Sequence, residues 1–254
     1  AVLYWGFELT RNEGNLRVQY GLITKRSVSI EERRLRGVQV DEPLLLRASG
    51  GARIKAIATG LGKKKGDDDK FELDADLLLP QAPRAEVARV AAGVLRVQPT
   101  PTSVPLVRHP RAAARRMFMW HTLGAAVPAA VLGVLSALGL TPDWIWQLLL
   151  VLIPIGALQG VGEYRGLGHG LTDEFLVVRW GVTPRSTAAV QRGGIIGWNV
   201  RQTIFQRRAG LITVGATIAA GSGLYRIRYA DQADGLAVAD AAIPGLIEPF
   251  LVKD

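Results

Sequence analysis

The sequence predicts a mainly β protein with membrane helices, in which two similar β-domains flank a helical hairpin. Three observations lead to this fold class. Two uncharged apolar runs of membrane-spanning length stand back to back near the middle of the chain. Short alternating strand patterns fill both flanks, and the flanks repeat each other at an offset of 160 residues.

The composition limits the classes of protein that the chain can belong to. Its 254 residues, 48% of them hydrophobic, are enough for two domains with cores of their own. The net charge of +9 suggests an anionic neighbour, either a phospholipid leaflet or a nucleic acid. No cysteine is present, which excludes disulfides, thiolate metal sites and a cysteine nucleophile.

The first β-domain is expected over residues 1–98. Residues 1–7, AVLYWGF, are apolar and look like the end of a preceding membrane span rather than a signal peptide. Strands are predicted at 16–20, 27–30, 38–41, 54–59 and 71–73. An apolar stripe from Val87 to Leu95 then predicts a closing helix over 85–95.

A transmembrane hairpin is expected over residues 117–163. The runs 117–140 and 144–162 contain no charged side chain, and each reaches the roughly 20 residues that cross a bilayer. The connection Thr141-Pro142-Asp143 is so short that the helices must be antiparallel. A soluble protein with a buried helical hairpin is the alternative, which two such runs flanked by arginines make less attractive.

Residues 99–116 form a basic juxtamembrane linker before the first span. Arginines stand in this linker and after the second span, whereas the tight turn between the spans has none. Because cytoplasmic flanks are enriched in Lys and Arg, both β-domains are expected on the cytoplasmic side of a multi-pass cell-membrane protein. Small residues at Gly156 and Gly160 recur every fourth position and would let the two helices approach closely.

The second β-domain is expected over residues 164–254. LRVQYG, which starts at Leu16, lies over LVVRWG, which starts at Leu176, and Arg47 lies over Arg207 at the same offset. Strands are predicted at 176–180, 187–190, 198–203, 211–218 and 224–229. A closing helix is predicted over 241–251, although Pro244 and Pro249 interrupt it.

This arrangement resembles the bacterial pleckstrin-homology-like membrane proteins of the YdbS/YdbT type. The matching stretch is QTIFQRRAGL, in which Gln202, Gln206, Arg207, Gly210 and Leu211 follow the family pattern. The longer segment 202–221 reads as strand, turn and strand. Gly194-Ile195-Ile196 departs from the family's Arg-Ile-Gln-like triplet, which the first copy keeps as Arg34-Leu35-Arg36. The resemblance implies two small β-barrels or rolls, each closed by a C-terminal helix, and links to envelope stress and resistance to membrane-active peptides.

Seven arginines are candidates for contact with the membrane surface or a partner. Basic groups near an anionic leaflet contribute about 1 kcal/mol each, while the competing explanation is a solvated strand edge that basic residues protect from pairing. The expected partners are the anionic leaflet and a membrane protein partner or homo-oligomer, with no nucleic acid. The candidates are Arg34, Arg36, Arg115, Arg116, Arg201, Arg207 and Arg208.

No pattern in the chain predicts catalysis, a cofactor or a metal. The three histidines lie in no metal-ligand motif, and the glycine pairs lack a nucleotide-binding context. The charged run over 63–70 reads as a hairpin loop. The chain is therefore expected to be a non-enzymatic, lipid-proximal scaffold or interaction module. The alternative is an accessory or structural subunit of a transporter or channel, for which His121 and a few polar side chains in the spans give thin support.

Overall fold

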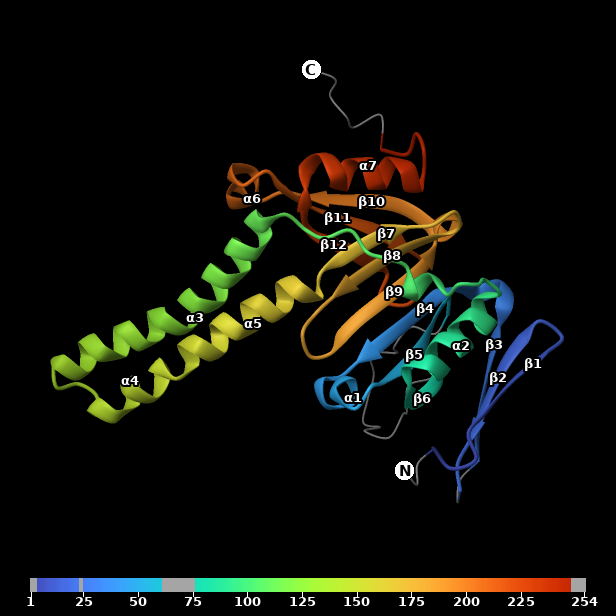
Figure 1. The fold of residues 1–254 in the computed structure, drawn as a ribbon, viewed down its shortest axis with the longest axis horizontal. Coiled ribbons are helices and arrows are strands. Elements are labelled where there is room, and N and C mark those ends of the chain that lie inside the picture. The colour runs from blue at the N-terminus through green and yellow to red at the C-terminus, as the bar shows by residue number, and fades with distance from the viewer. Residues whose placement is uncertain (1–3, 23–24, 61–75, 248–254) are drawn as a thin grey trace.

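The computed structural model describes residues 4–22, 25–60 and 76–247, and they form a mainly β fold from which two long helical arms project (Figure 1). In its described residues the first unit, 8–95, contains six strands, a 3-10 turn and two helices. Its elements are β1 (Glu8–Asn12), β2 (Asn15–Tyr20), β3 (Arg26–Glu31), η2 (Glu32–Arg34), β4 (Leu35–Glu42), α1 (Leu44–Ala48), β5 (Gly51–Ala58), β6 (Leu77–Pro83) and α2 (Arg84–Leu95).

The second unit, residues 168–242, repeats the same order of elements. Most of them keep the spacing of 160 residues, so that β8 corresponds to β2 and α6 corresponds to α1. Its elements are β7 (Gly168–Leu171), β8 (Phe175–Trp180), β9 (Arg185–Gln191), η4 (Arg192–Gly194), β10 (Ile195–Arg201), α6 (Ile204–Arg208), β11 (Leu211–Ile218), β12 (Leu224–Asp231) and α7 (Gln232–Ala242).

The two units share one sheet. The strand order β6-β5-β4-β9-β8-β7 runs from one unit into the other, with smaller sheets β1-β2-β3 and β10-β11-β12 at either side. Strands β4 and β9 are antiparallel, from the pair Gly37↔Val190 to the pair Glu42↔Arg185. We call this β4–β9 pairing the seam. It was not anticipated from the sequence.

Each unit has its own core beneath its helix. In the first unit Val18 and Ile54 pack with Val87 of α2, and in the second Val214 and Ile227 pack with Ala239 of α7. Ile57 of β5 belongs to the core of the second unit, so the cores meet at the seam. Tyr4 and Phe7, from the segment expected to end a membrane span, lie near the ring of Tyr20, and residues 1–3 are outside the described residues.

The closing helix of the second unit lies earlier than predicted. A helix was expected over 241–251, but α7 ends at Ala242, before Pro244 and a left-handed Gly245. Asp231 caps its first turn by accepting a hydrogen bond from the Ala233 N–H at 3.0 Å. The helix packs through small residues, because a Cβ on Gly235 would lie 2.8 Å from Ile212. Small residues have weak apolar periodicity, which hid this helix from pattern analysis.

The turn expected within residues 202–221 is a short helix, α6 (Ile204–Arg208), and β11 follows it at the predicted residues 211–218. The Thr203 hydroxyl accepts from the Gln206 N–H, and the Gln206 side chain accepts from the Thr203 N–H, which completes a capping box for α6. The predicted strand over 71–73 and the charged run over 63–70 lie outside the described residues, and β6 follows them at Leu77–Pro83.

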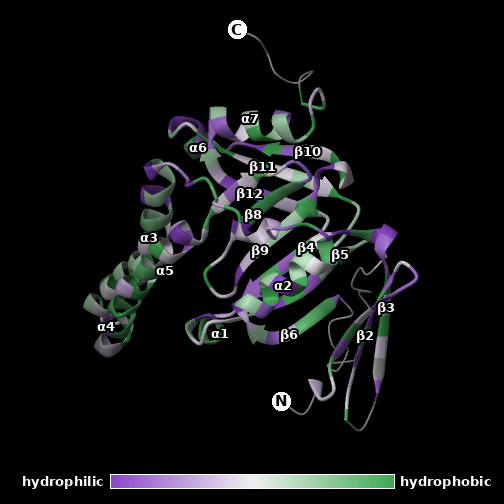
Figure 2. Ribbon diagram, turned by 45° about the vertical axis from the view of Figure 1, so that its right-hand side comes forward, coloured by the Kyte–Doolittle hydropathy of each residue, from purple (hydrophilic) through white to green (hydrophobic). Residues whose placement is uncertain are grey.

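The apolar segments form α3 (Arg111–Ala137), α4 (Asp143–Leu150) and α5 (Leu152–Gly166). Only 6% and 11% of their most apolar windows are buried, which suits a lipid environment better than a soluble core. Figure 2 shows them standing away from the sheets. The predicted close approach is confirmed, because a Cβ on Gly156 or Gly160 would lie 2.7 or 2.9 Å from backbone oxygens of α3.

Candidate anion-binding groove at the base of the membrane helices

A groove of about 610 Å³ lies where α3 meets the sheet β10-β11-β12. Four of its ten lining residues are arginines, and none is acidic. The remaining groups are hydroxyls, amides, one aromatic ring and one leucine. The lining comprises Arg116, Asn199, Arg201, Thr203, Gln206, Thr213, Leu224, Arg226, Arg228 and Tyr229.

Alternation along β12 turns two of the arginines into the groove. Tyr225 and Ile227 are buried in the core, so Arg226 and Arg228, which alternate with them, point to the outer face and are exposed. The register between β11 and β12 shifts at this point, and Tyr229 has a φ of 56°. This bulge redirects the chain, as bulges at binding sites commonly do.

Arg116 connects the first membrane helix to the second unit. Its guanidinium lies 5.6 Å from the ring centre of Phe205 on α6 and 5.7 Å from that of Tyr229. Contacts of this kind contribute about 0.5–1 kcal/mol where they are exposed. These contacts hold the start of α3 beside the groove. Arg116 therefore lines the same groove as the arginines of β10 and β12.

An ion-paired cluster lies beside the groove at the base of the helices. The His121 Nε2 and the Glu163 carboxylate are 2.7 Å apart, and Arg228 approaches the same carboxylate at 3.9 Å. His121 lies in the first span and Glu163 follows the second. The Glu163 carboxylate therefore offsets part of the positive charge of the groove, at the point where the helices leave the sheets.

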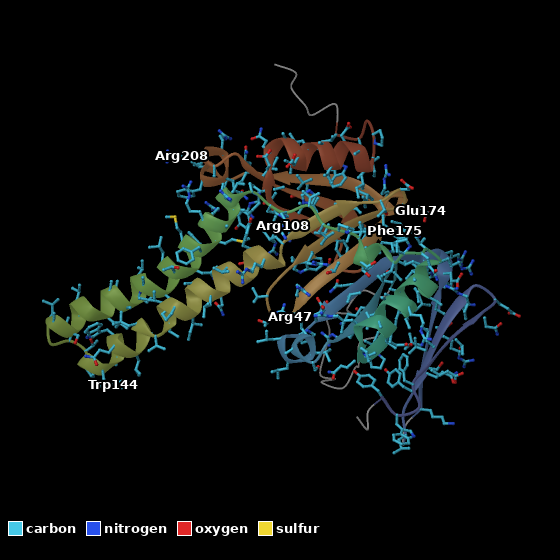
Figure 3. The ribbon with its side chains drawn as sticks, viewed as in Figure 1. Arg47, Arg108, Trp144, Glu174, Phe175 and Arg208 are labelled. Atoms are coloured by element: carbon cyan, nitrogen blue, oxygen red, sulfur yellow. The ribbon has the colours of Figure 1, made fainter. Side chains whose placement is uncertain are left out.

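Two exposed apolar tips lie on the same side of the molecule as the helices. Ile204 and Phe205 on α6 are 70% and 63% exposed, and Leu45 on α1 is 85% exposed. The tips occupy equivalent places in the two units, and both face the side from which α3 and α5 project (Figures 1 and 2). Figure 3 shows Arg208 on α6 and Arg47 on α1 at the same side.

The structure brings four of the seven candidate arginines to this side. Arg116 and Arg201 line the groove, and Arg207 and Arg208 are exposed on the neighbouring α6. Arg207 differs from its counterpart Arg47, which donates to the Val182 carbonyl at 3.3 Å. The copies therefore use this position differently.

The other three candidates lie elsewhere. Arg115 is exposed on α3 outside the groove. Arg34 pairs with Glu31 at 3.2 Å, and Arg36 lies against Gly194 of η4. Both belong to the end of β4 opposite α1, away from the membrane helices (Figure 1).

Sequence reasoning missed Arg226, Arg228 and Tyr229. Their signal is the stretch LYRIRYAD, in which arginines alternate with core residues along β12. The alternation could have identified two outward-facing cations, but nothing local to it indicates that Arg116 lies across from them.

His109 and His169 form a buried pair outside the groove. Their rings meet edge to face at 5.2 Å, and no ring nitrogen has a hydrogen-bond partner. Burial lowers the pKa of His109 to about 4, and the neighbouring His169 acts in the same direction. Burial also lowers the pKa of His169, against a smaller opposing effect of Asp234. Across the described residues, no three metal-ligating side chains gather.

Two β units of matching order and the helices between them define a class, and the chain belongs to the bacterial PH domain family. The profile of that family matches residues 1–98 and 123–242, which is well over half of the chain. The recognition of a protein of the YdbS/YdbT type is thereby confirmed.

Among individual proteins, the chain is similar to the UPF0699 transmembrane protein YdbT of Bacillus subtilis (strain 168). The two are 21% identical over 229 residues, which cover 90% of this chain and 44% of that protein. The chain thus spans less than half the length of this relative. No solved structure matches it. The transmembrane relative and the two apolar helices together support a membrane location.

Proposed function

We propose that the chain is a non-catalytic membrane scaffold whose second unit binds anionic phospholipid headgroups in the arginine-lined groove. The observation that carries this proposal is the position of the groove at the base of α3, with Arg116 of that helix in its wall. A headgroup phosphate at the membrane surface would meet arginines that present several donors each.

The exposed tips support the same orientation. Phe205 of α6 and Leu45 of α1 would enter the interfacial region of the leaflet while Arg207 and Arg208 stay at the headgroups. Exposed apolar side chains beside basic ones suit a membrane surface better than open solvent. Two tips and the helices would hold the shared sheet at a set distance from the bilayer.

Lipid binding can be measured on the whole chain, since the shared sheet argues against testing the second unit alone. Native mass spectrometry of the detergent-solubilised protein should show phosphatidylglycerol bound in preference to phosphatidylcholine. Replacing Arg201 and Arg228 by Gln should weaken phosphatidylglycerol binding roughly thirtyfold, at about 1 kcal/mol for each basic group.

Arg33→Gln is the matched control, because Arg33 is exposed and basic but lies on η2 at the far end of the first unit. It should leave lipid binding unchanged. Equal binding of the two lipids, or equal loss in Arg33→Gln, would contradict the proposal. Added inorganic phosphate should compete only weakly if the lipid, rather than free phosphate, is the ligand.

We further propose that both units face the cytoplasm, as the arginines flanking the spans suggest. The chain has no cysteine, so Leu140→Cys, between the two spans, and Ser222→Cys, on the turn between β11 and β12, each create a single thiol. In intact cells a membrane-impermeant maleimide should label Leu140→Cys alone. Labelling of Ser222→Cys before lysis would reverse the orientation.

A further inference from the structure

The strand of the second unit that corresponds to β4 is β10, and among the described residues β10 has no partner in the place that β9 takes beside β4. β4 pairs with β5 on one side and β9 on the other. Its counterpart β10 pairs with β11 on one side, and among the described residues no strand lies on its other side. The same holds for β3, the counterpart of β9, which pairs with β2 alone in the part of the chain that the structure describes.

The backbone of β10 reproduces the features by which β4 accepts a strand. The register of β4 against β5 shifts between Leu35 and Gly37, and that of β10 against β11 shifts between Ile195 and Gly197. A bulge of this kind bends a strand and alters how its edge is presented. The bulge is therefore retained at an edge with no strand on it.

The glycine after each bulge shows what the bulge accommodates. A Cβ on Gly37 would lie 2.0 Å from the Ala189 carbonyl oxygen of β9, so the seam forms only because this residue is glycine. A Cβ on the equivalent Gly197 would meet nothing within 4 Å. The second unit therefore has a glycine at the same position, although no described backbone lies close enough to exclude a side chain there.

The charges at the strand ends differ and would select the occupant. At the seam, Glu42 of β4 meets Arg185 of β9 at 2.6 Å, and Asp41 accepts from Ser186 at 2.7 Å. In β10 the place of Asp41 is taken by Arg201, which is exposed. In the register of the seam, the β3 of a second copy would bring the basic Lys25 and Arg26 to this end, which opposes self-association.

We propose that the free edge of β10 binds the edge strand of another bacterial PH domain, in the register of the seam, and that this strand begins with acidic residues that pair with Arg201. Gly197 would accept the carbonyl of that strand as Gly37 accepts Ala189. The partner is thus a second domain of the same fold and opposite charge, bound by β-augmentation. Arg201 also lines the groove, so this interaction and lipid binding would share one side chain, whereas the strand pairing itself uses the backbone edge of β10.

A second copy with an acidic β3 is a suitable probe of this edge. Position 200 of β10 corresponds to Val40 at the seam, which faces Thr187, so a partner β3 would place Ser27 opposite Val200. The acceptor carries Val200→Cys, and the probe carries Ser27→Cys with Lys25→Glu and Arg26→Glu. Both exposed positions can accept cysteine, and oxidation of the mixed proteins in one membrane then traps only intermolecular pairs.

The acidic probe should crosslink to the acceptor on the order of tenfold more than a probe with the native β3, as expected when the like-charged pair of Arg26 and Arg201 is reversed and Lys25 beside it becomes acidic. Adding Gly197→Val to the acceptor should remove the crosslink, although a Cβ at this position has no atom within 4 Å in the free chain. Equal crosslinking of acidic and native probes, or a crosslink that survives Gly197→Val, would overturn the proposal.

Discussion

The same position holds opposite charges in the two units. In the first, Glu32 accepts from Arg96, just after α2, at 2.8 Å and is also paired with Arg11 of β1. In the second, its counterpart is Arg192, which donates to the Ala242 and Ala241 carbonyls at the end of α7 and to the Asp173 carbonyl after β7. Both side chains tie the helix end to the strand turn, so the contact is retained while its chemistry is reversed.

The ends of β4 and β10 differ with a larger consequence. Asp41 and Glu42 are buried among arginines and belong to the seam. Arg201 and Gln202, at the same places in β10, border an open groove. A repeated backbone can thus carry an acidic end that joins the two units and a basic end that remains available. Three predictions test how the two units differ.

Reversing the charge of Glu42 should have the largest effect. Its carboxylate accepts from Arg84 at 2.9 Å and Arg185 at 2.6 Å and is 9% exposed. Glu42→Lys would bury a third cation among two arginines and should lower the free energy of unfolding by about 3–5 kcal/mol. Denaturant titration in detergent micelles, followed by tryptophan fluorescence, measures this change.

Gln202→Lys is the matched control in the second unit. Gln202 is partly buried and donates neutral hydrogen bonds to the Leu211 carbonyl and to Gln232. The substitution should cost about 1 kcal/mol or less. If the two variants lost similar stability, the seam would not depend on its acidic end.

Acidification should destabilise the fold through the buried pair formed by His169 of the second unit and His109 of the linker before α3. With a pKa of about 4 for folded His109 and about 6.5 for an unfolded histidine, only the unfolded chain binds this proton between those values. Stability is therefore full above about pH 6.5 and falls as the pH is lowered towards 4, by about 3 kcal/mol from His109.

The first unit has Leu9 where the second has His169, so it lacks this source of pH dependence. A variant with both His109→Leu and His169→Leu should show a flatter decline of unfolding free energy with falling pH. The comparison requires the same detergent titration repeated from pH 7 to pH 4. An unchanged decline would remove the pair as its cause.

Removing Arg192 should have the smallest effect of the three. Arg192→Ala deletes charge-assisted hydrogen bonds to the carbonyls of α7 and of the turn after β7, and should cost about 2 kcal/mol. Arg33→Ala removes only an exposed pair with Glu31 and should leave stability nearly unchanged, because exposed ion pairs contribute little. Thermal unfolding of the two variants distinguishes a structural contact from a surface pair.

Local patterns predicted much of the fold. Uncharged runs revealed the membrane helices, because a bilayer tolerates few charges over about 20 residues. Alternation revealed most strands, including β5 and β11. Alternation could not reveal α6, which is five residues long and whose local signal is the capping box of Thr203 and Gln206. Nor could it locate α7, whose packing face consists of small residues.

The candidate site was only half visible. Basic residues were recognised along QTIFQRRAGL and before the first span, and Arg116 and Arg201 do line the groove. Arg34 was selected on the same grounds but pairs with Glu31 at the other end of its unit. The sequence shows that a residue is basic. Whether its side chain reaches the groove depends on which end of the strand it occupies in the folded unit.

The sequence by itself determined most of the strands, the internal repeat, the apolar helices and the excess of basic charge, because each follows from hydrophobicity, turns or charge along the sequence. Only the tertiary structure decided that β4 pairs with β9, that Arg116 and Arg228 share one groove and that, among the residues the structure describes, no strand pairs with the second edge of β10. These features join residues many positions apart, and strand pairing over such distances depends on the packing of whole units rather than on local preference.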